Sequence, residues 1–325
     1  MTAHAIRMTS TGGPEVLEFV EVDVPEPGPG QAVVEVHAGG VNFIDTYHRS
    51  GLYEVPLPFT PGSEGAGVVT AVGADVDAVT VGDRVAWVGV AASYASHVVA
   101  NAEMLMSVPD DIALDTAAAI PLQAMTAHYL ITDTYPLGPG DTCLVHAAAG
   151  GTGRLIVQMA KLRGARVVAT AGSDAKLELA RSAGADHTIN YREADIVSGV
   201  EAAVGKDAID AVYDGVGAAT FDAGLAVLRP RGVMATFGNA SGAGPPVSPL
   251  ALMPKSLFLA RPSLFSHMLT HEERIGRWNE IIGWVQAGEL EIRIGHTWPL
   301  AEAGAAHAAL ESRATTGKLL LVAKD

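Results

Sequence analysis

The chain has 325 residues, 49% of them apolar and 18% charged, and this composition suits a well-packed protein of two domains and excludes a disordered one. Its formal net charge of −15, without any basic run, disfavours binding to nucleic acids and to anionic membranes. The single cysteine, Cys143, excludes an internal disulfide, and no apolar run reaches the ~18 residues of a membrane span, so we expect a soluble, cytoplasmic protein.

The first 120 residues are typical of a β-rich domain. Runs of alternating apolar and polar residues are separated by glycine and proline, and they predict strands over 31–37, 68–73 and 83–88. The spacing then becomes helical over 111–119. A second helix, over 125–131, is expected to link two domains.

From residue 141 strands and helices alternate. The predicted strands are 142–146, 165–170, 187–190, 209–214, 232–237 and 256–260, and the helices between the first five are 155–162, 175–182, 195–203 and 221–228. This rhythm predicts an α/β fold, a doubly wound parallel sheet with helices on both faces. Cys143 lies within the first of these strands and is expected to be a core residue.

The last 65 residues break the rhythm. They predict a helix over 273–287, a strand over 292–298, a helix over 301–310 and a strand over 318–322. We expect this segment to fold back onto the N-terminal domain. The expected domains are therefore 1–122 together with 262–325, and 123–261.

A loop of small residues follows the strand 142–146 and leads into a helix. It matches the dinucleotide-binding pattern G-x-G-x-x-G with Ala148 at the first glycine, and its other members are Gly150, Gly151, Thr152 and Gly153. Small residues let the backbone approach a pyrophosphate, and a helix N-terminus offers unpaired N–H groups to it. A glycine loop alone is weak support, so the residues that follow it matter.

The next strand ends at Thr170-Ala171-Gly172 without an acidic residue at its tip, where NAD sites usually carry one for the ribose hydroxyls, and Ser173 is the N-cap candidate of the helix that follows. Lys176 is placed to reach a 2′-phosphate, which favours NADP. In the alternative, Asp174 is the NAD-binding acid and Lys176 is a solvated lysine. Tyr191 and Arg192, after the third strand, are either a second wall of the phosphate site or surface residues.

Ligands for a catalytic metal are missing where related enzymes have them. The segments 40–45 and 61–67 are similar to the ligand segments of zinc-dependent alcohol dehydrogenases, with Asn42 in the place of a cysteine and Ser63 in the place of a histidine. No histidines stand at ligand spacing with a third partner nearby. We therefore expect no metal.

Over its whole length the chain resembles the zinc-free NADPH:quinone oxidoreductases related to zeta-crystallin, in the medium-chain dehydrogenase/reductase superfamily. The segments that carry the resemblance are 40–47, 51–53, 61–67, 81–85, 146–153, 189–193, 213–217, 237–242, 261–264 and 311–318. The resemblance implies a Rossmann domain and a β-rich, GroES-like catalytic domain. It also implies a homodimer, paired through the sheet edge at 256–260.

The resemblance assigns roles to single residues. Asn42 and Tyr47 would lie beside the nicotinamide and the substrate, and Tyr53 at the rim of the pocket. The residues implied to hold NADPH, besides the glycine loop with Ala148, are Thr126, Gly172, Ser173, Lys176, Tyr191, Phe237, Asn239, Arg261, Ser263, Arg313 and Lys318. The alternatives are core packing for Tyr47 and Phe237, an ion pair for Arg261 and a solvated charge for Lys318.

The implied reaction is direct hydride transfer from NADPH to a quinone. A quinone is already electrophilic, so it needs no metal, only hydrogen-bond donors such as the Asn42 amide and the Tyr47 hydroxyl at the oxygen that gains charge. Reduction of an activated carbon–carbon double bond is the alternative, with Tyr47 or Tyr53 as the acid. A more remote alternative is a non-catalytic NADPH-binding protein.

Overall fold

The computed structural model describes residues 3–323, and the chain divides into two compact units. One unit comprises Met1–Leu122, Leu269–Gln286 and Ile292–Asp325, and the other comprises Gln123–Met268 and Ala287–Glu291. Residues 262–268 and 287–291 thus belong to the second unit and not, as expected, to the first.

Two side-chain contacts explain this difference. The His267 ring stacks on Tyr129 with ring centroids 4.3 Å apart, and its Nδ1 lies 3.0 Å from Asp133 Oδ2. Glu291 pairs with Arg154 of the second unit, with Nη2 and Oε2 2.7 Å apart.

The second unit is built on a six-stranded sheet in the order β10-β9-β8-β11-β12-β13, with every neighbouring pair parallel. The strands are β8 (Thr142–Val145), β9 (Arg166–Ala171), β10 (His187–Asn190), β11 (Ile209–Asp214), β12 (Leu228–Thr236) and β13 (Phe258–Ala260). The order reverses between β8 and β11, which is the topological switch point of a Rossmann fold. This confirms the predicted doubly wound sheet.

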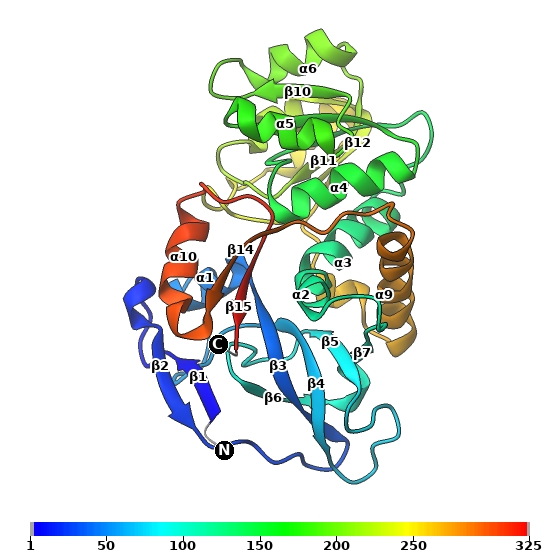
Figure 1. The fold of residues 1–325 in the computed structure, drawn as a ribbon. Coiled ribbons are helices and arrows are strands. Elements are labelled where there is room, and N and C mark those ends of the chain that lie inside the picture. The colour runs from blue at the N-terminus through cyan, green and yellow to red at the C-terminus, as the bar shows by residue number, and fades with distance from the viewer. Residues whose placement is uncertain (1–2, 324–325) are drawn as a thin grey trace. The chain divides into compact units, whose positions relative to one another are not determined.

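The crossover helices are α4 (Gly151–Leu162), α5 (Asp174–Ser182), α6 (Ile196–Val204) and α7 (Phe221–Val227) (Figure 1). Helix α4 packs against α5, and α6 packs against α7. Helix α4 begins four residues before the predicted start at 155, because the glycine loop enters it directly. Cys143 is fully buried in β8, as expected.

The segment before β8 is α3 (Pro121–Tyr129), which continues as one π-helical turn over Leu130–Thr134. The single helix predicted over 125–131 therefore starts earlier and changes type. After β12 come α8 (Pro249–Leu252) and a short turn of helix over Leu264–His267.

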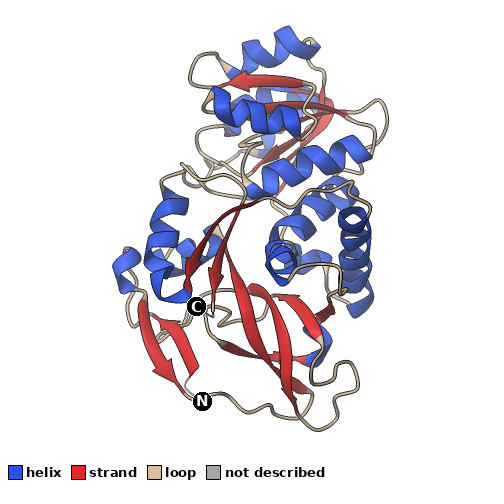
Figure 2. Cartoon of the chain, in the orientation of Figure 1, coloured by secondary structure: helices blue, strands red, loops and turns tan. Residues whose placement is uncertain are grey.

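The first unit contains a mixed sheet in the order β14-β15-β3-β4-β5-β7, and β6 also pairs with β3 (Figure 2). Its strands are β3 (Gln31–Val41), β4 (Glu64–Val72), β5 (Arg84–Val88), β6 (His97–Asn101), β7 (Met106–Ser107), β14 (Ile294–Pro299) and β15 (Lys318–Val322). Strand β15 pairs antiparallel with β3, with Leu320 opposite Gly40, so the end of the chain joins the sheet begun near residue 31. A separate hairpin pairs β1 (Ala3–Arg7) with β2 (Glu18–Val22).

The helices of this unit are α1 (Phe43–Ser50), α2 (Leu114–Ala119), α9 (His271–Gln286) and α10 (Ala303–Glu311). Helix α1 follows β3 without a loop, beginning after Asn42 and ending at Gly51, whose φ of +81° suits glycine. Among residues 3–323, none of the helices combines the length and the apolar character that crossing a membrane requires.

Candidate active site

The glycine loop forms a tight turn at the carboxyl end of β8. Ala147 adopts φ +50°, and the Gly150 N–H donates to its carbonyl oxygen at 2.9 Å. Helix α4 then begins after Gly150 with no side chain capping it. The first N–H groups of α4 therefore point out of the helix toward whatever binds there.

Gly153 explains why the loop needs glycine at its last position. A Cβ at residue 153 would lie 2.5 Å from the Ala147 carbonyl oxygen and 3.0 Å from the Ala148 Cα. Both neighbours are backbone atoms that cannot move aside cheaply. The small residues thus bring the helix start close to the strand, and this cradle of backbone donors fits a pyrophosphate.

Two polar side chains that the sequence analysis did not single out lie at the carboxyl ends of β8 and β11, beside this loop. His146, at the end of β8, places Nδ1 3.0 Å from Thr170 Oγ1, and burial lowers its pKa, so the ring is neutral. Asp214, at the end of β11, accepts from the Val216 and Gly217 N–H groups at 2.7 and 3.1 Å. They stand at the carboxyl ends of the paired neighbouring strands β8 and β11, at the switch point.

The end of β9 carries the residues predicted to read the adenosine phosphate. The pKa of Lys176 is lowered, first by partial burial and then by the nearby positive charge of Arg192. A bound anion would favour the charged form of Lys176, which Arg192 opposes. A Cβ at Gly172 would lie 2.6 Å from the Tyr191 hydroxyl, so glycine lets that ring approach the strand end. Asp174 accepts from the Asn190 amide at 3.3 Å.

A second group of predicted cofactor residues follows the carboxyl ends of β12 and β13. Arg261 donates through Nη1 to the carbonyl oxygens of Thr236 and Gly238 at 2.9 and 3.3 Å. With the Asn239 amide oriented to suit its neighbours, its oxygen accepts from Arg261 Nη2 at 3.1 Å. The Phe237 ring lies against Gly215, where an added Cβ would be 3.0 Å from it.

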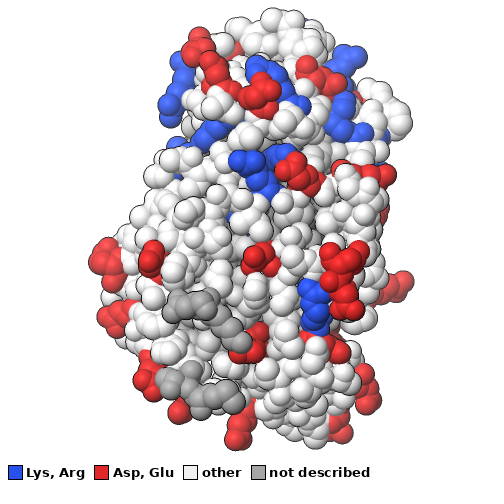
Figure 3. Space-filling model, in the orientation of Figure 1, with Lys and Arg blue, Asp and Glu red and all other residues white. Residues whose placement is uncertain are grey.

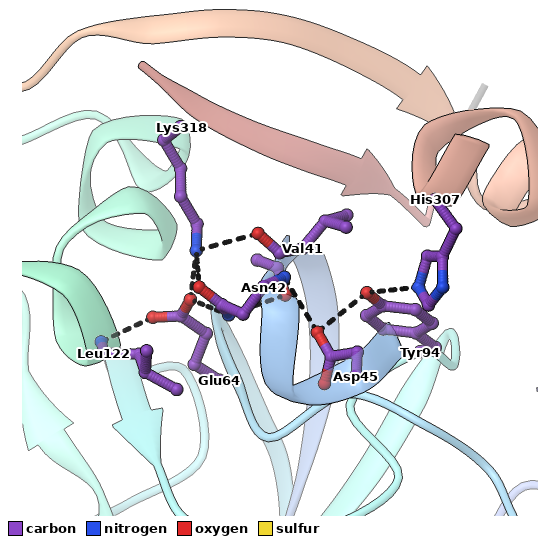
Figure 4. A network of polar contacts seen from close by, with 9 residues as sticks. Val41, Asn42, Asp45, Glu64, Tyr94, Leu122, His307 and Lys318 are labelled. Carbon is purple, nitrogen blue, oxygen red and sulfur yellow. Dashed lines mark hydrogen bonds and ion pairs between the residues drawn. The ribbon is translucent and has the colours of Figure 1, made fainter. Parts of the chain in front are cut away.

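In the first unit the central feature is a buried ion pair between Glu64 of β4 and Lys318 of β15 (Figure 4). Their side chains are 0% and 1% exposed. Glu64 Oε2 also accepts from the Leu122 N–H, at the start of α3, at 2.6 Å. Lys318 was expected either to close over the cofactor or to carry a solvated charge. The structure buries its side chain against Glu64, so the solvated alternative is wrong.

Asn42 joins this ion pair from the end of β3. Its Oδ1 accepts from Lys318 Nζ at 2.7 Å, and its Nδ2 donates to Glu64 Oε1 at 2.6 Å and to the Gly40 carbonyl oxygen at 3.3 Å (Figure 4). Both amide hydrogens are therefore engaged within the protein. In this arrangement Asn42 has no amide hydrogen left for the hydrogen bond to a substrate that the sequence analysis expected.

A second arm of the network leaves from the backbone of Asn42. Asp45 Oδ2 accepts from the Asn42 N–H at 2.8 Å and from the Tyr94 hydroxyl at 3.0 Å. Burial, countered in part by these two bonds and by Lys318, raises the pKa of Asp45 to about 7. Tyr94 Oη in turn lies 3.1 Å from His307 Nε2 (Figure 4). Burial lowers the pKa of His307 to about 3, so this ring is neutral.

The predicted substrate tyrosines come together beside this network. Tyr47 of α1 and Tyr53 of the loop after it meet edge to face, with ring centroids 5.3 Å apart. Phe43 and His48 extend the cluster, at 6.2 Å from Tyr47 and Tyr53 respectively. Tyr53 is exposed at the edge of the cluster, and Tyr47 is only partly buried. An aromatic surface of this kind suits a flat ring.

Other predicted residues are less clearly joined to these groups. Thr126 is buried within α3, and Ser263 precedes the helical turn at Leu264–His267. Arg313 stands at a turn after α10 with φ +56°. Within residues 3–323, no group of three or more His, Cys, Asp or Glu side chains could hold a metal ion.

Sequence reasoning missed Glu64, Asp45, Tyr94 and His307 as parts of one network. Asp45 and Glu64 stood within segments that resemble the family, and a carboxylate inside an otherwise apolar or glycine-rich segment was the available signal. Nothing in the sequence pairs either with Tyr94, His307 or Lys318, because those contacts join residues up to 254 positions apart.

Comparison with known proteins agrees with this architecture. Residues 28–110 match the family described as the alcohol dehydrogenase GroES-like domain, and residues 151–287 match the zinc-binding dehydrogenase family. The chain is 42% identical to a quinone oxidoreductase of Pseudomonas aeruginosa over 98% of its own length and 99% of the relative's. It is 40% identical to a 2-haloacrylate reductase of a Burkholderia species over 96% of each chain.

A solved structure shares the whole fold. The crystal structure of Escherichia coli quinone oxidoreductase complexed with NADPH superposes with a TM-score of 0.96 at 40% identity, covering 98% of this chain and 99% of the other. The two matching domain families, the glycine loop at the switch point and about 40% identity over nearly the whole chain together assign the protein to a family. The chain belongs to the quinone oxidoreductase family of zinc-free medium-chain dehydrogenases/reductases.

Proposed function

We propose that this protein reduces quinones, with NADPH as the electron donor. The observation that carries the proposal is the backbone cradle at Gly150–Gly153 in a chain that is 42% identical to a quinone oxidoreductase over nearly its full length. NADPH, when bound, supplies a hydride. The E. coli relative of known structure binds NADPH.

The second unit supplies the groups that would hold NADPH. The N–H groups at the start of α4 would bind the pyrophosphate, next to Gly150 and Gly153. Lys176 and Arg192 would bind the 2′-phosphate, and the Tyr191 ring would lie against the adenosine. Asp174 already accepts from Asn190, which leaves less of its carboxylate for ribose hydroxyls and supports NADP over NAD.

The first unit supplies the groups that would act on the acceptor. The aromatic pair Tyr47 and Tyr53 would stack on the quinone ring and exclude water from it. The Tyr47 hydroxyl would donate a hydrogen bond to the quinone oxygen that gains negative charge. Since the amide hydrogens of Asn42 are engaged by Glu64 and Gly40, Asn42 would shape the site by holding Lys318.

The test is NADPH oxidation followed at 340 nm with 1,4-benzoquinone and 9,10-phenanthrenequinone. Fast turnover with NADPH and slow turnover with NADH is the expected result. Tyr47→Phe should lower the turnover number and leave the Kd for NADPH unchanged. Unchanged kinetics in this variant would remove Tyr47 from the mechanism.

Reduction of an activated double bond is the second candidate, and the 2-haloacrylate reductase at 40% identity favours it. That reaction requires a proton at the carbon next to the activating group, so the tyrosine hydroxyls would serve as acids. The same assay with 2-chloroacrylate, trans-2-alkenals and crotonyl-thioester decides between the two. Absence of NADPH oxidation with every acceptor, while NADPH still binds, would leave a non-catalytic binding protein.

A homodimer and a cytoplasmic location are part of the same proposal. Strand β13 forms one edge of the six-stranded sheet, and its Phe258 is 61% exposed. Leu250 and Met253, shortly before it, are 72% and 68% exposed. An apolar sheet edge of this kind favours pairing with a second copy. Sedimentation velocity should give a dimer, and Phe258→Glu should give a monomer.

A further inference from the structure

A chain of buried hydrogen bonds runs from the surface of the first unit to the start of α1. Glu311 binds the guanidinium of Arg49 through two bonds, of 2.7 and 3.1 Å. Arg49 Nη1 lies 3.4 Å from His307 Nδ1, and His307 Nε2 lies 3.1 Å from the Tyr94 hydroxyl. The hydroxyl then donates to Asp45 Oδ2 at 3.0 Å.

The two ends of this chain fix its direction. Arg49 can only donate, so Nδ1 of the neutral His307 ring must accept and Nε2 must carry the hydrogen. Nε2 therefore donates to the Tyr94 oxygen, and the Tyr94 hydroxyl donates to Asp45. Burial and the charge of Asp45 raise the pKa of Tyr94, so its hydroxyl keeps the hydrogen. Since arginine does not release a proton in proteins, the chain orients groups and does not conduct protons.

Asp45 is the acceptor on which the donors converge. Its Oδ2 accepts hydrogen bonds from the Tyr94 hydroxyl and from the Asn42 N–H. At the start of a helix such an N–H has no acceptor within the helix backbone. Its Oδ1 is buried and has no hydrogen-bond partner. Asp45 thus ties the first turn of α1 to the interior of the unit. This turn lies between the end of β3, which carries Gly40, and Tyr47.

We propose that Asp45 is a positioning residue for the reduction: it holds the first turn of α1, and with it Asn42 and Tyr47, in the arrangement that the reaction requires. The chain from Arg49 holds the Asp45 carboxyl in the orientation that does this. The inference rests on the proposed function, since Tyr47 is the group that would face the acceptor.

Charges on every neighbouring element act on Asp45. Lys318 of β15 stabilises its ionised form and Glu64 of β4 opposes it. His307 of α10 is neutral, and Tyr94, before β6, donates its hydroxyl hydrogen to Asp45. Arg49 lies on its own helix. With a pKa of about 7, Asp45 gains a proton as the pH falls through neutrality, and its bonds to the Asn42 N–H and to Tyr94 lose their charge assistance.

Two variants separate the acceptor from the charge. Asp45→Ala removes the acceptor and should lower kcat about ten- to a hundred-fold, the scale of a misplaced group, with the Kd for NADPH unchanged. Asp45→Asn can keep an oxygen at the Oδ2 position with its amide nitrogen at the unpartnered Oδ1 position, so it should restore the part of kcat that the acceptor provides, up to the level of the wild type with Asp45 protonated below about pH 7. Wild-type kcat should fall as the pH drops through about 7, and Asp45→Asn should lack this step.

Glu291→Gln is the matched control, because it breaks the ion pair with Arg154 in the other unit and leaves α1 untouched. An Asp45→Ala enzyme with the kcat of the wild type would overturn the proposal. An equal loss of kcat in Glu291→Gln would overturn it too, since destabilisation alone would then explain the effect.

Two structural measurements do not depend on activity. Nitrogen-15 NMR of His307 should show a bare Nδ1 and a protonated Nε2, and the opposite tautomer would overturn the chain. Hydrogen exchange at the Asn42 amide should accelerate in Asp45→Ala, or in Tyr94→Phe where Asp45→Ala does not fold, and stay slow in Glu291→Gln. If these hold while the wild type reduces no quinone, the proposed function fails and the anchoring of α1 by Asp45 stands.

Discussion

At the scale of single residues, the first unit surrounds its buried ion pair with polar partners. Glu64 and Lys318 lie in the core of the first unit, and each makes at least three contacts with polar atoms. Removing one member of such a pair leaves an uncompensated buried charge, which costs about 3–5 kcal/mol, whereas removing both charges costs less. The pair therefore fixes a geometry more than it adds stability.

Lys318→Met should therefore lower the free energy of unfolding by about 3–5 kcal/mol, because Glu64 keeps its charge without a partner. Adding Glu64→Gln should recover part of this loss, since the amide oxygen can still accept from the Leu122 N–H. Urea unfolding of the wild type, both single variants and the double variant measures the coupling. Strictly additive losses would contradict this account.

In the proposed function, Lys176 is the residue on which the choice of NADPH over NADH depends. Lys176→Ala should raise the Kd for NADPH about ten- to a hundred-fold, the value of one charge-assisted hydrogen bond, and leave the Kd for NADH unchanged. Fluorescence titration with both nucleotides measures this. Lys255→Ala is the control, because Lys255 pairs with Asp207 and is distant in sequence from the phosphate residues. Equal weakening of both nucleotides would refute the assignment.

At the scale of elements, the sequence predicted regular structure where periodicity and breakers agree. The strands His187–Asn190, Ile209–Asp214 and Lys318–Val322 have the predicted bounds. Helix α1 was not predicted, because its eight residues directly follow an eleven-residue strand without a breaker between them. The π-helical turn after Tyr129 leaves no signal in apolar spacing either.

The candidate site divides in the same way. The glycine loop was predictable because its chemistry lies in consecutive residues whose small size has a local cause. The network around Asn42 was not, because β3, β4, β15 and α10 bring its members together only in the folded chain. The engagement of the Asn42 amide by Glu64 is a property of packing, which one sequence does not reveal.

Two glycines, Gly40 in β3 and Gly276 in α9, stand in opposite environments and allow these elements to be tested by substitution. In β3, a Cβ at Gly40 would lie 2.7 Å from Lys318 Cε and from Glu64 Cδ, so Gly40→Ala should displace the ion pair and lower both the Tm and kcat. In α9, Gly276 has open space around it, so Gly276→Ala should stabilise the protein by up to about 1 kcal/mol through helix propensity. Thermal unfolding of the two variants compares them directly, and equal effects would be incompatible with these environments.

At the scale of the whole molecule, charge and pH act on the protein together. Acidic side chains are spread over the face shown in Figure 3, with basic side chains in small groups between them. With a net charge of −15, this surface offers no continuous basic area on that face for a polyanion. In the proposed function, phosphate recognition is instead local and falls to Lys176, Arg192 and the start of α4.

Two buried groups of the first unit give the stability a characteristic dependence on pH. The pKa of Asp45 is raised from 3.8 to about 7, mainly by burial, so between these values the folded chain holds a proton that the unfolded chain does not. Its contribution to the free energy of unfolding falls as the pH rises from about 4 to 7. The pKa of His307 is lowered by burial from 6.5 to about 3, so its contribution falls as the pH drops through that range.

Between about pH 4 and 6.5 the contributions of Asp45 and His307 to the free energy of unfolding change in opposite directions with pH. The variants Asp45→Asn and His307→Gln should each remove one of these pH dependences. Relative to the wild type, the free energy of unfolding of Asp45→Asn should rise as the pH increases from about 4 to 7. That of His307→Gln should rise, relative to the wild type, as the pH decreases from 6.5 to about 3. Urea unfolding at several pH values gives both differences. Parallel curves for the wild type and both variants would show that neither group titrates as the burial of this network requires.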